Sequence, residues 1–113
     1  MKKKLNFQTK AIIAGRSVDA MSGKTFETFN PANGKVLAKI ARCEKADADA
    51  AVEAARNAFE NGPWPKMSPA ERKVILQRFA TLIEAHTDEL AELETMEAGK
   101  PISDCIEIDL PET

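Results

Sequence analysis

The chain has 113 residues, of which 43% are hydrophobic and 30% are charged, and its formal net charge is −2. This length allows one modest core, and the composition is ordinary for a soluble globular protein. Bases alternate with acids along the chain, which argues against a nucleic-acid partner. No stretch approaches a membrane span, and no apolar run follows the basic start MKKK as a secretory signal requires. We therefore expect neither a nucleic-acid nor a membrane partner, and a cytoplasmic location.

The residues that most often bind metals or attack substrates are scarce. Cys43 and Cys105 are far apart in the sequence, and His86 is the single histidine. This spacing matches neither a zinc site nor a disulfide framework. We expect both cysteines to be packing residues or surface thiols rather than nucleophiles.

The first forty residues predict two β-hairpins. In the segment AIIAGRSVDA, a short β-branched run and a second short strand flank a turn at Ala14-Gly15. The segment KTFETFN then alternates polar and apolar side chains, and NPANGK leads into VLAKIA. Pro31 presets a turn, and Asn33-Gly34 can supply the left-handed residues that reverse the chain.

From Glu44 the hydrophobic period changes from two to 3.6, which predicts a helix. Asp47 and Asp49 lie in its first turns, and Gly62 lies just beyond its end. Its apolar face comprises Ala48, Val52, Ala55 and Phe59. The prolines of the following segment GPWPKMSP predict a rigid, non-helical connection.

A second helix begins with the strongest start signal in the chain. Ser68 can cap it, Pro69 fits the first helical position, and Glu71 completes a capping box. The spacing predicts a buried apolar stripe along this helix, with His86 at its C-terminal end: Ile75, Phe79, Leu82, Ile83 and His86.

A third helix carries Leu90, Leu93 and Glu97 and ends at Gly99, a suitable left-handed C′ residue. Glu97 lies in the last turn, where the negative end of the helix dipole disfavours an acid. Another helix could begin at Pro101, but we expect Pro111 to interrupt it. The fold class expected for the segment is therefore an α+β piece with two N-terminal β-hairpins followed by three to four helices.

No active-site motif is visible in these elements. All five glycines are explained as turn or cap residues, and neither GxGxxG nor GxxxxGK[ST] is present to hold a phosphate. The sequence therefore offers no catalytic and no cofactor-binding residue. The carboxylates are assigned to a solvated helix face, namely Asp88, Glu89, Glu92 and Glu94.

The order of these parts resembles the N-terminal region of the NAD(P)-dependent aldehyde dehydrogenase superfamily. The most specific segments are TFETFNPANGKVLA, SPAERKVIL and ELAELETMEAGKPI, and the resemblance runs from about Ala11 to the last residue. Within the family, FENGPWPKMSPAERK and LIEAHTDELAELET look most like aminoaldehyde dehydrogenases, especially those that oxidise γ-glutamyl-γ-aminobutyraldehyde in polyamine breakdown. Betaine-aldehyde and broad-range enzymes share much of this pattern.

The resemblance implies an α/β, Rossmann-like, homo-oligomeric enzyme that oxidises a small-molecule aldehyde to its carboxylic acid with NAD or NADP. Residues 1–113 would be the N-terminal part of its cofactor-binding domain, truncated before the Rossmann core and the catalytic domain. The family's nucleophile, base and cofactor residues lie downstream, so the segment alone is predicted to be inactive and to bind no cofactor. The alternative is a stand-alone truncated homologue that acts as a binding or oligomer-interaction module through the apolar faces around Val52, Ile75 and Phe79.

One site of the family does reach this segment. Many relatives hold a structural sodium or potassium ion with the acid before the xGKP turn and the backbone carbonyl that precedes the Asn-Pro pair. The matching positions are Glu97 and Phe29, although relatives generally have aspartate where this chain has Glu97. The resemblance thus implies a cation ligand at Glu97, and the alternative is a solvated or salt-bridged acid at the helix end.

Overall fold

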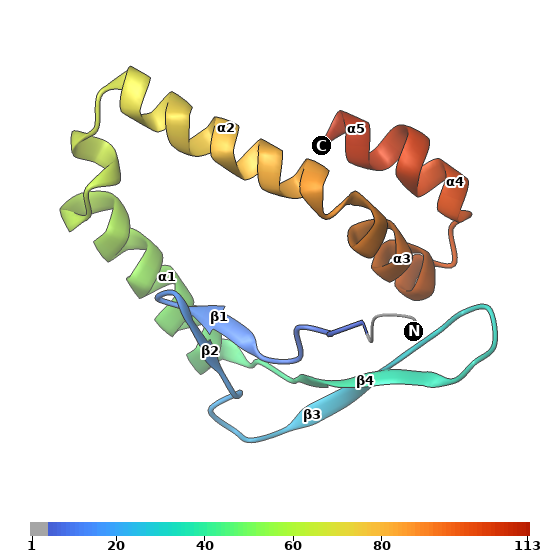
Figure 1. Cartoon of the computed structure of the whole chain (residues 1–113). Helices are drawn as coiled ribbons and strands as arrows, with labels where there is room; N and C mark the ends of the chain where they lie inside the picture. The colour runs from blue at the N-terminus through green and yellow to red at the C-terminus, as the bar shows by residue number, and fades with distance from the viewer. Residues whose placement is uncertain (1–4) are drawn as a thin grey trace. The chain divides into compact units, whose positions relative to one another are not determined.

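The computed structural model describes residues 5–113, so the basic start MKKK lies outside the described residues. The chain divides into two compact units. The first unit comprises residues 5–7, Thr28–Ala38 and Ile75–Thr113. The second unit comprises Gln8–Glu27 and Lys39–Val74. Figure 1 shows the order of the elements, with strands in the first part of the chain and helices in the rest.

The first predicted hairpin is confirmed. Strands β1 (Ala11–Ile13) and β2 (Arg16–Val18) pair antiparallel, with Ala11 opposite Val18. The two turn residues, Ala14 and Gly15, have φ angles of 51° and 73°. Two successive positive φ angles match the right-handed twist of the strands, but they force Ala14 into a conformation that suits asparagine or glycine better.

The second predicted hairpin is also confirmed, because β3 (Thr25–Phe29) pairs with β4 (Val36–Ala41) in a separate two-stranded sheet. The chain then enters α1 (Lys45–Asn61), which begins after Glu44 and ends at Gly62 as the spacing predicts. The Gly62 N–H donates to the Ala58 carbonyl at 3.0 Å and closes the last turn.

The expectation that the prolines exclude helix between α1 and α2 is wrong. Trp64–Lys66 form a single 3₁₀ turn, which the Met67 N–H closes on the Trp64 carbonyl at 3.2 Å. Pro65 occupies a position in the first turn, where no N–H is needed, so a turn this short tolerates it.

Helix α2 (Pro69–Ala85) begins with the predicted capping box. The Glu71 Oε2 accepts hydrogen bonds from the Ser68 N–H at 2.7 Å and from the Ser68 hydroxyl at 2.8 Å. The Glu71 N–H completes the box by donating to the Ser68 Oγ at 3.3 Å.

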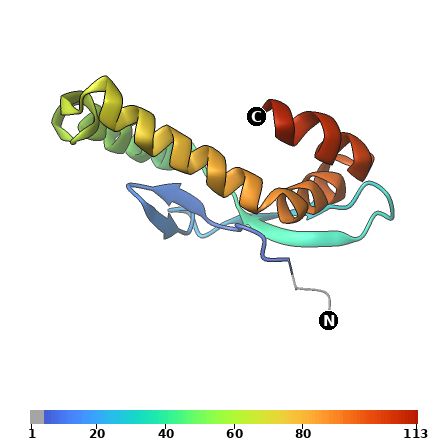
Figure 2. The same ribbon diagram turned by 45° about the horizontal axis from the view of Figure 1, so that its top comes forward.

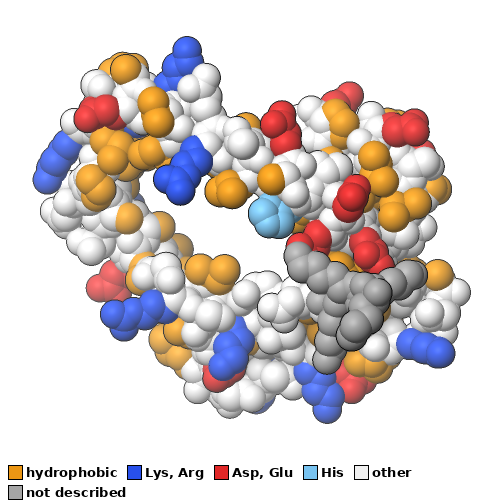
Figure 3. Space-filling view, viewed as in Figure 1, with side chains coloured by type: hydrophobic (Ala, Val, Ile, Leu, Met, Phe, Trp, Pro, Cys, Tyr) orange, Lys and Arg blue, Asp and Glu red, His pale blue; other side chains and the backbone are white. Residues whose placement is uncertain are grey.

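The predicted stripe on α2 exists but is not buried. Ile75 is 43% exposed, Phe79 61% and Leu82 51%, so burial of this face is a wrong prediction for the chain as it stands. The periodicity reports which residues share a face, whereas burial depends on another element that covers the face. Figure 3 shows apolar side chains at the surface over the helical elements.

Helix α3 (Thr87–Ala98) ends at Gly99, whose φ of 72° and N–H bond to the Thr95 carbonyl at 3.0 Å confirm the predicted cap. His86 is not the last residue of α2 but the residue between α2 and α3. Its Nδ1 lies 2.8 Å from the Leu82 carbonyl oxygen, as expected for a histidine at a helix end.

The expectation that Pro111 interrupts the last helix is wrong. A helical run continues through α4 (Ile102–Asp104), a π-helical turn (Cys105–Asp109) and α5 (Leu110–Glu112). In the π turn the Leu110 N–H donates to the Cys105 carbonyl, five residues back. Because this pairing shifts by one residue just before Pro111, the chain can accommodate a residue that has no N–H to donate.

The core of the first unit lies between α3 and this last helical run, which Figures 1 and 2 show side by side. Ala91 and Cys105 are both fully buried there. The Thr95 hydroxyl lies 3.6 Å from the Cys105 sulfur and links the two segments. Within residues 5–113, no helix is both long and apolar enough to cross a membrane.

Candidate cation site

The loop between β3 and β4 is held by its own asparagines. The Asn30 N–H donates to the Lys35 carbonyl at 2.8 Å, and the Asn30 side-chain oxygen accepts the Ala32 N–H at 2.9 Å. The Gly34 N–H donates to the Asn30 carbonyl at 2.8 Å, with Gly34 at a φ of 68°. This bonding fixes the loop that directly follows Phe29, the residue whose carbonyl is the first candidate ligand.

The end of α3 touches this loop within the first unit. A Cβ atom added to Gly99 would lie only 2.8 Å from Cγ of Pro31. Pro31 follows Phe29 by two residues, and Gly99 follows Glu97 by two residues. The structure therefore brings together the two segments that carry the predicted ligands.

The charges at the end of α3 favour a cation. No lysine or arginine occupies the last turn of α3, and the side chain of Glu97 is exposed there. Lys100 follows at once, but its ammonium lies 2.6 Å from each carboxylate oxygen of Asp109. The hydrogen bond to Asp109 is the main reason why the pKa of Lys100 lies above its usual value. The helix end therefore keeps its negative dipole with an additional carboxylate and no basic side chain in the turn.

The donor atoms at this position suit a hard cation. A carboxylate and a backbone carbonyl both offer oxygen, the ligand type that ions such as sodium and potassium share with calcium and magnesium. Within residues 5–113, no group of three or more histidine, cysteine, aspartate or glutamate side chains is placed to hold a metal. The candidate site thus consists of one side chain and one main-chain carbonyl.

The two cysteines lie in different environments. Cys105 is fully buried against Thr95, and Cys43 is exposed. The glycines that take positive φ angles close turns or end a helix, and none of the described glycines opens a helix as a phosphate-binding loop does.

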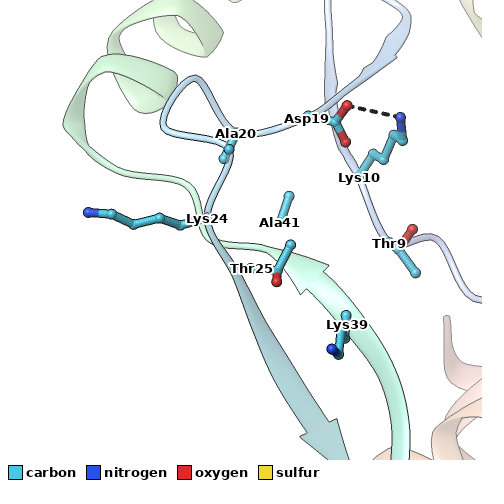
Figure 4. A pocket seen from close by; sticks show the side chains of 9 residues that line it. Thr9, Lys10, Asp19, Ala20, Lys24, Thr25, Lys39 and Ala41 are labelled. Atoms are coloured by element: carbon cyan, nitrogen blue, oxygen red, sulfur yellow. Dashed lines mark hydrogen bonds and ion pairs between the residues drawn. The ribbon is translucent and has the colours of Figure 1, made fainter.

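A cavity of about 250 Å³ in the second unit was not predicted from the sequence (Figure 4). Small side chains of Ala20, Thr25 and Ala41 lie on its wall, while Lys24 points away from them. The three lysines of the wall are each paired with a carboxylate: Lys10 with Asp19 at 3.1 Å, Lys24 with Glu44 at 3.0 Å and Lys39 with Glu27 at 3.9 Å. These pairs balance the charge of the wall, so the cavity has no excess of one sign with which to select an ion.

Comparison with known proteins gives consistent matches in sequence and in structure. The aldehyde dehydrogenase family model matches residues 18–113. The chain is 49% identical over 102 residues to a mitochondrial benzaldehyde dehydrogenase of Antirrhinum majus, covering 90% of this chain and 19% of that protein. It is 48% identical over 109 residues to an aminoacetaldehyde dehydrogenase of Pseudomonas aeruginosa, covering 96% of this chain and 22% of that protein.

Solved structures show the same fold. The γ-glutamyl-γ-aminobutyraldehyde dehydrogenase of Burkholderia cenocepacia matches with a TM-score of 0.91 and 48% identity, over 95% of this chain and 22% of that chain. An indole-3-acetaldehyde dehydrogenase of P. syringae, solved with NAD⁺, matches with a TM-score of 0.90 and 46% identity, over 97% of this chain and 22% of that chain. The chain thus spans about a fifth of the length of the curated relatives that it matches. With a family match over residues 18–113 and a shared fold at nearly half identity, the chain belongs to the aldehyde dehydrogenase family.

Proposed function

We propose that residues 1–113 form the N-terminal part of the cofactor-binding domain of an aldehyde dehydrogenase, which oxidises an aldehyde to its carboxylic acid with NAD⁺ or NADP⁺. The observation that carries this proposal is the family match over residues 18–113. NAD(P)⁺ supplies the hydride acceptor when it is bound. In this proposal the segment contributes structure to such an enzyme, and the catalytic and cofactor-binding residues lie outside residues 1–113.

An exchange of segments tests this role. The matching segment of the B. cenocepacia enzyme is replaced by this chain, and reduction of NAD⁺ is measured with an aldehyde substrate. We expect the chimera to keep activity, because 48% identity over a shared fold preserves the surfaces that the rest of the domain packs on. A chimera that folds as the parent does but is inactive would contradict the proposal.

The isolated chain is expected to be inactive. The measurement is NAD(P)H formation by the purified 113-residue chain with aminoacetaldehyde and with benzaldehyde, beside the intact relative as a positive control. Turnover by the isolated chain, abolished by the substitution Cys43→Ser, would refute the assignment of no catalytic residue to this segment.

We further propose an aminoaldehyde of polyamine breakdown as the substrate class, in a cytoplasmic homo-oligomer. The similarity to the P. aeruginosa and B. cenocepacia enzymes supports this choice. To test this, the enzyme that contains this chain is captured from its source cells with an antibody against the chain, and its kcat/KM is measured for aminoaldehydes and for benzaldehyde. A higher kcat/KM for aminoaldehydes than for benzaldehyde is expected, and the reverse order would exclude the class.

For Glu97 and Phe29 we propose a structural sodium or potassium site. Two observations support this site. Pro31 contacts Gly99, and the Glu97 carboxylate lies at the end of α3, whose last turn carries no basic side chain. The thermal midpoint of the chimera is compared in sodium chloride, potassium chloride and choline chloride at equal ionic strength. We expect a higher midpoint with sodium or potassium, lost in Glu97→Gln and kept in the control Glu94→Gln. Equal midpoints in all three salts would exclude the site.

A second candidate function is that of an interaction module, and one observation favours it. The residues at the centres of its proposed surfaces are exposed: Val52 by 64%, Ile75 by 43% and Phe79 by 61%. Such apolar exposure is typical of surfaces that another element or protein covers. A chain that is monomeric by sedimentation and recovers no partner from cells would exclude this function.

A further inference from the structure

Among the described residues, Asp47 is the one polar or charged residue that is buried, with 3% exposure. Its Oδ1 accepts the Met21 N–H at 2.8 Å, and its Oδ2 accepts the Glu44 N–H at 2.8 Å. No ion pair to Asp47 occurs within residues 5–113. The carboxylate charge is therefore stabilised by backbone N–H groups and by its position in the first turn of α1, where the helix dipole is positive.

The bond to Met21 joins positions 26 residues apart in the sequence, whereas the bond to Glu44 is local and belongs to the capping box of α1. Met21 belongs to the connection between β2 and β3, and Glu44 is the residue before α1. The connection contains the buried Ala20 and a turn that the Gly23 N–H closes on the Ala20 carbonyl at 2.8 Å. Asp19, Ala20, Gly23 and Lys24 of this connection form part of the wall of the 250 Å³ cavity. Asp47 thus holds one wall of that cavity against the start of α1.

The charged neighbours of Asp47 are engaged elsewhere. On the side of α1, Lys45 pairs with Asp49; on the side of the connection, Lys24 pairs with Glu44 and Lys10 pairs with Asp19. Cys43 lines the same groove as Asp47. Lys24 and Lys45, the lysines of these two segments, would each have to leave an existing pair in order to pair with Asp47. The partners of the carboxylate are its two N–H donors, those of Met21 and Glu44.

From this geometry we propose that Asp47 is an acid-operated latch, whose ionised carboxylate closes the β2–β3 connection onto α1 and whose protonation releases that connection and opens the cavity wall. Protonation adds an O–H donor to one oxygen, which can then no longer accept an N–H with the same geometry. The N–H groups of Glu44 and Met21 hold the pKa of Asp47 below its ordinary value. The latch is therefore closed above the usual aspartate pKa and opens as the pH falls through the lowered value.

Amide hydrogen exchange of the full 113-residue chain tests the latch. In Asp47→Asn the amide of Met21 should exchange at least about tenfold faster at neutral pH, whereas amides in the middle of α1, such as Ala55, serve as the internal reference for unfolding of the second unit. The matched control is Asp49→Asn, two residues along the same helix and exposed, which should leave Met21 unchanged. Equal exchange of Met21 in the two variants, or acceleration of Met21 and Ala55 alike, would overturn the proposal.

A titration of the unsubstituted chain provides a test that does not depend on folding of the variant. The amide chemical shifts of Met21 and Glu44 should follow one common midpoint below the ordinary aspartate value, and faster exchange of Met21 should accompany it. Midpoints that differ between the two amides, or a common midpoint at the ordinary value, would exclude Asp47 as the latch.

Discussion

The contact between Gly99 and Pro31 predicts that Gly99→Ala destabilises the chain more than a glycine substitution in a free turn. Gly99 has a φ of 72°, and a left-handed conformation costs an alanine about 1–2 kcal/mol. In addition, the new Cβ would lie 2.8 Å from Cγ of Pro31, so a ring atom must move. Overpacking of this kind costs about 1–3 kcal/mol, and we expect a total loss of about 2–5 kcal/mol.

Gly34→Ala is the matched control. Gly34 has a nearly identical φ of 68°, but a Cβ atom there would meet nothing within 4 Å. Gly34→Ala should therefore lower the free energy of unfolding only by the cost of the left-handed conformation, about 1–2 kcal/mol. The assay is urea denaturation followed by circular dichroism, with the free energy of unfolding obtained for each variant.

A double-mutant cycle isolates the contact itself. Pro31→Ala removes the ring atom that the new methyl group meets, so Gly99→Ala should cost about 1–2 kcal/mol in the Pro31→Ala background, as Gly34→Ala does. Two results would refute the reasoning: equal costs for Gly99→Ala and Gly34→Ala in the native background, or an unchanged cost of Gly99→Ala without Pro31. Either would mean that the loop and the end of α3 do not touch.

Three further substitutions test local features of the fold. Ala14→Asn should stabilise the first hairpin by about 1 kcal/mol, because asparagine tolerates the positive φ of the turn, and a lower thermal midpoint would contradict this expectation. Ser68→Ala should cost about 1 kcal/mol by removing the cap of α2, measured by urea denaturation, with Ser103→Ala as the control. Asp109→Asn should lower the thermal midpoint at neutral pH. Because Asp109 raises the pKa of Lys100, this contribution is present below the unfolded pKa of lysine and is lost as the pH rises through the raised folded value. The difference between Asp109→Asn and the native chain should therefore shrink at strongly alkaline pH, and a constant difference would show that the bond is not responsible.

The features that depend on near neighbours along the chain could be predicted from the amino-acid pattern. The turn at Ala14-Gly15, the capping box at Ser68 and the left-handed end of α3 at Gly99 were all predicted correctly. Each involves residues no more than about four positions apart, whose backbone conformations and hydrogen bonds are fixed by local sterics. The resemblance to the family added a prediction of the fold, and it implied that Phe29 and Glu97 are ligands of one cation.

Other features join residues that are far apart in the sequence and form only when the elements pack together. Asp47 was predicted as a first-turn acid of α1, but its burial and its bond to Met21, 26 residues away, depend on how the first hairpin packs. The exposure of Phe79 on α2 likewise depends on which elements cover that face, and periodicity cannot report this. The helical run through Pro111 was also not predicted, although it involves near neighbours. A π turn shifts the backbone hydrogen bonds by one residue just before the proline, so the helix continues. Local chemistry thus selects the elements, whereas burial and long-range bonds follow from the packing of those elements.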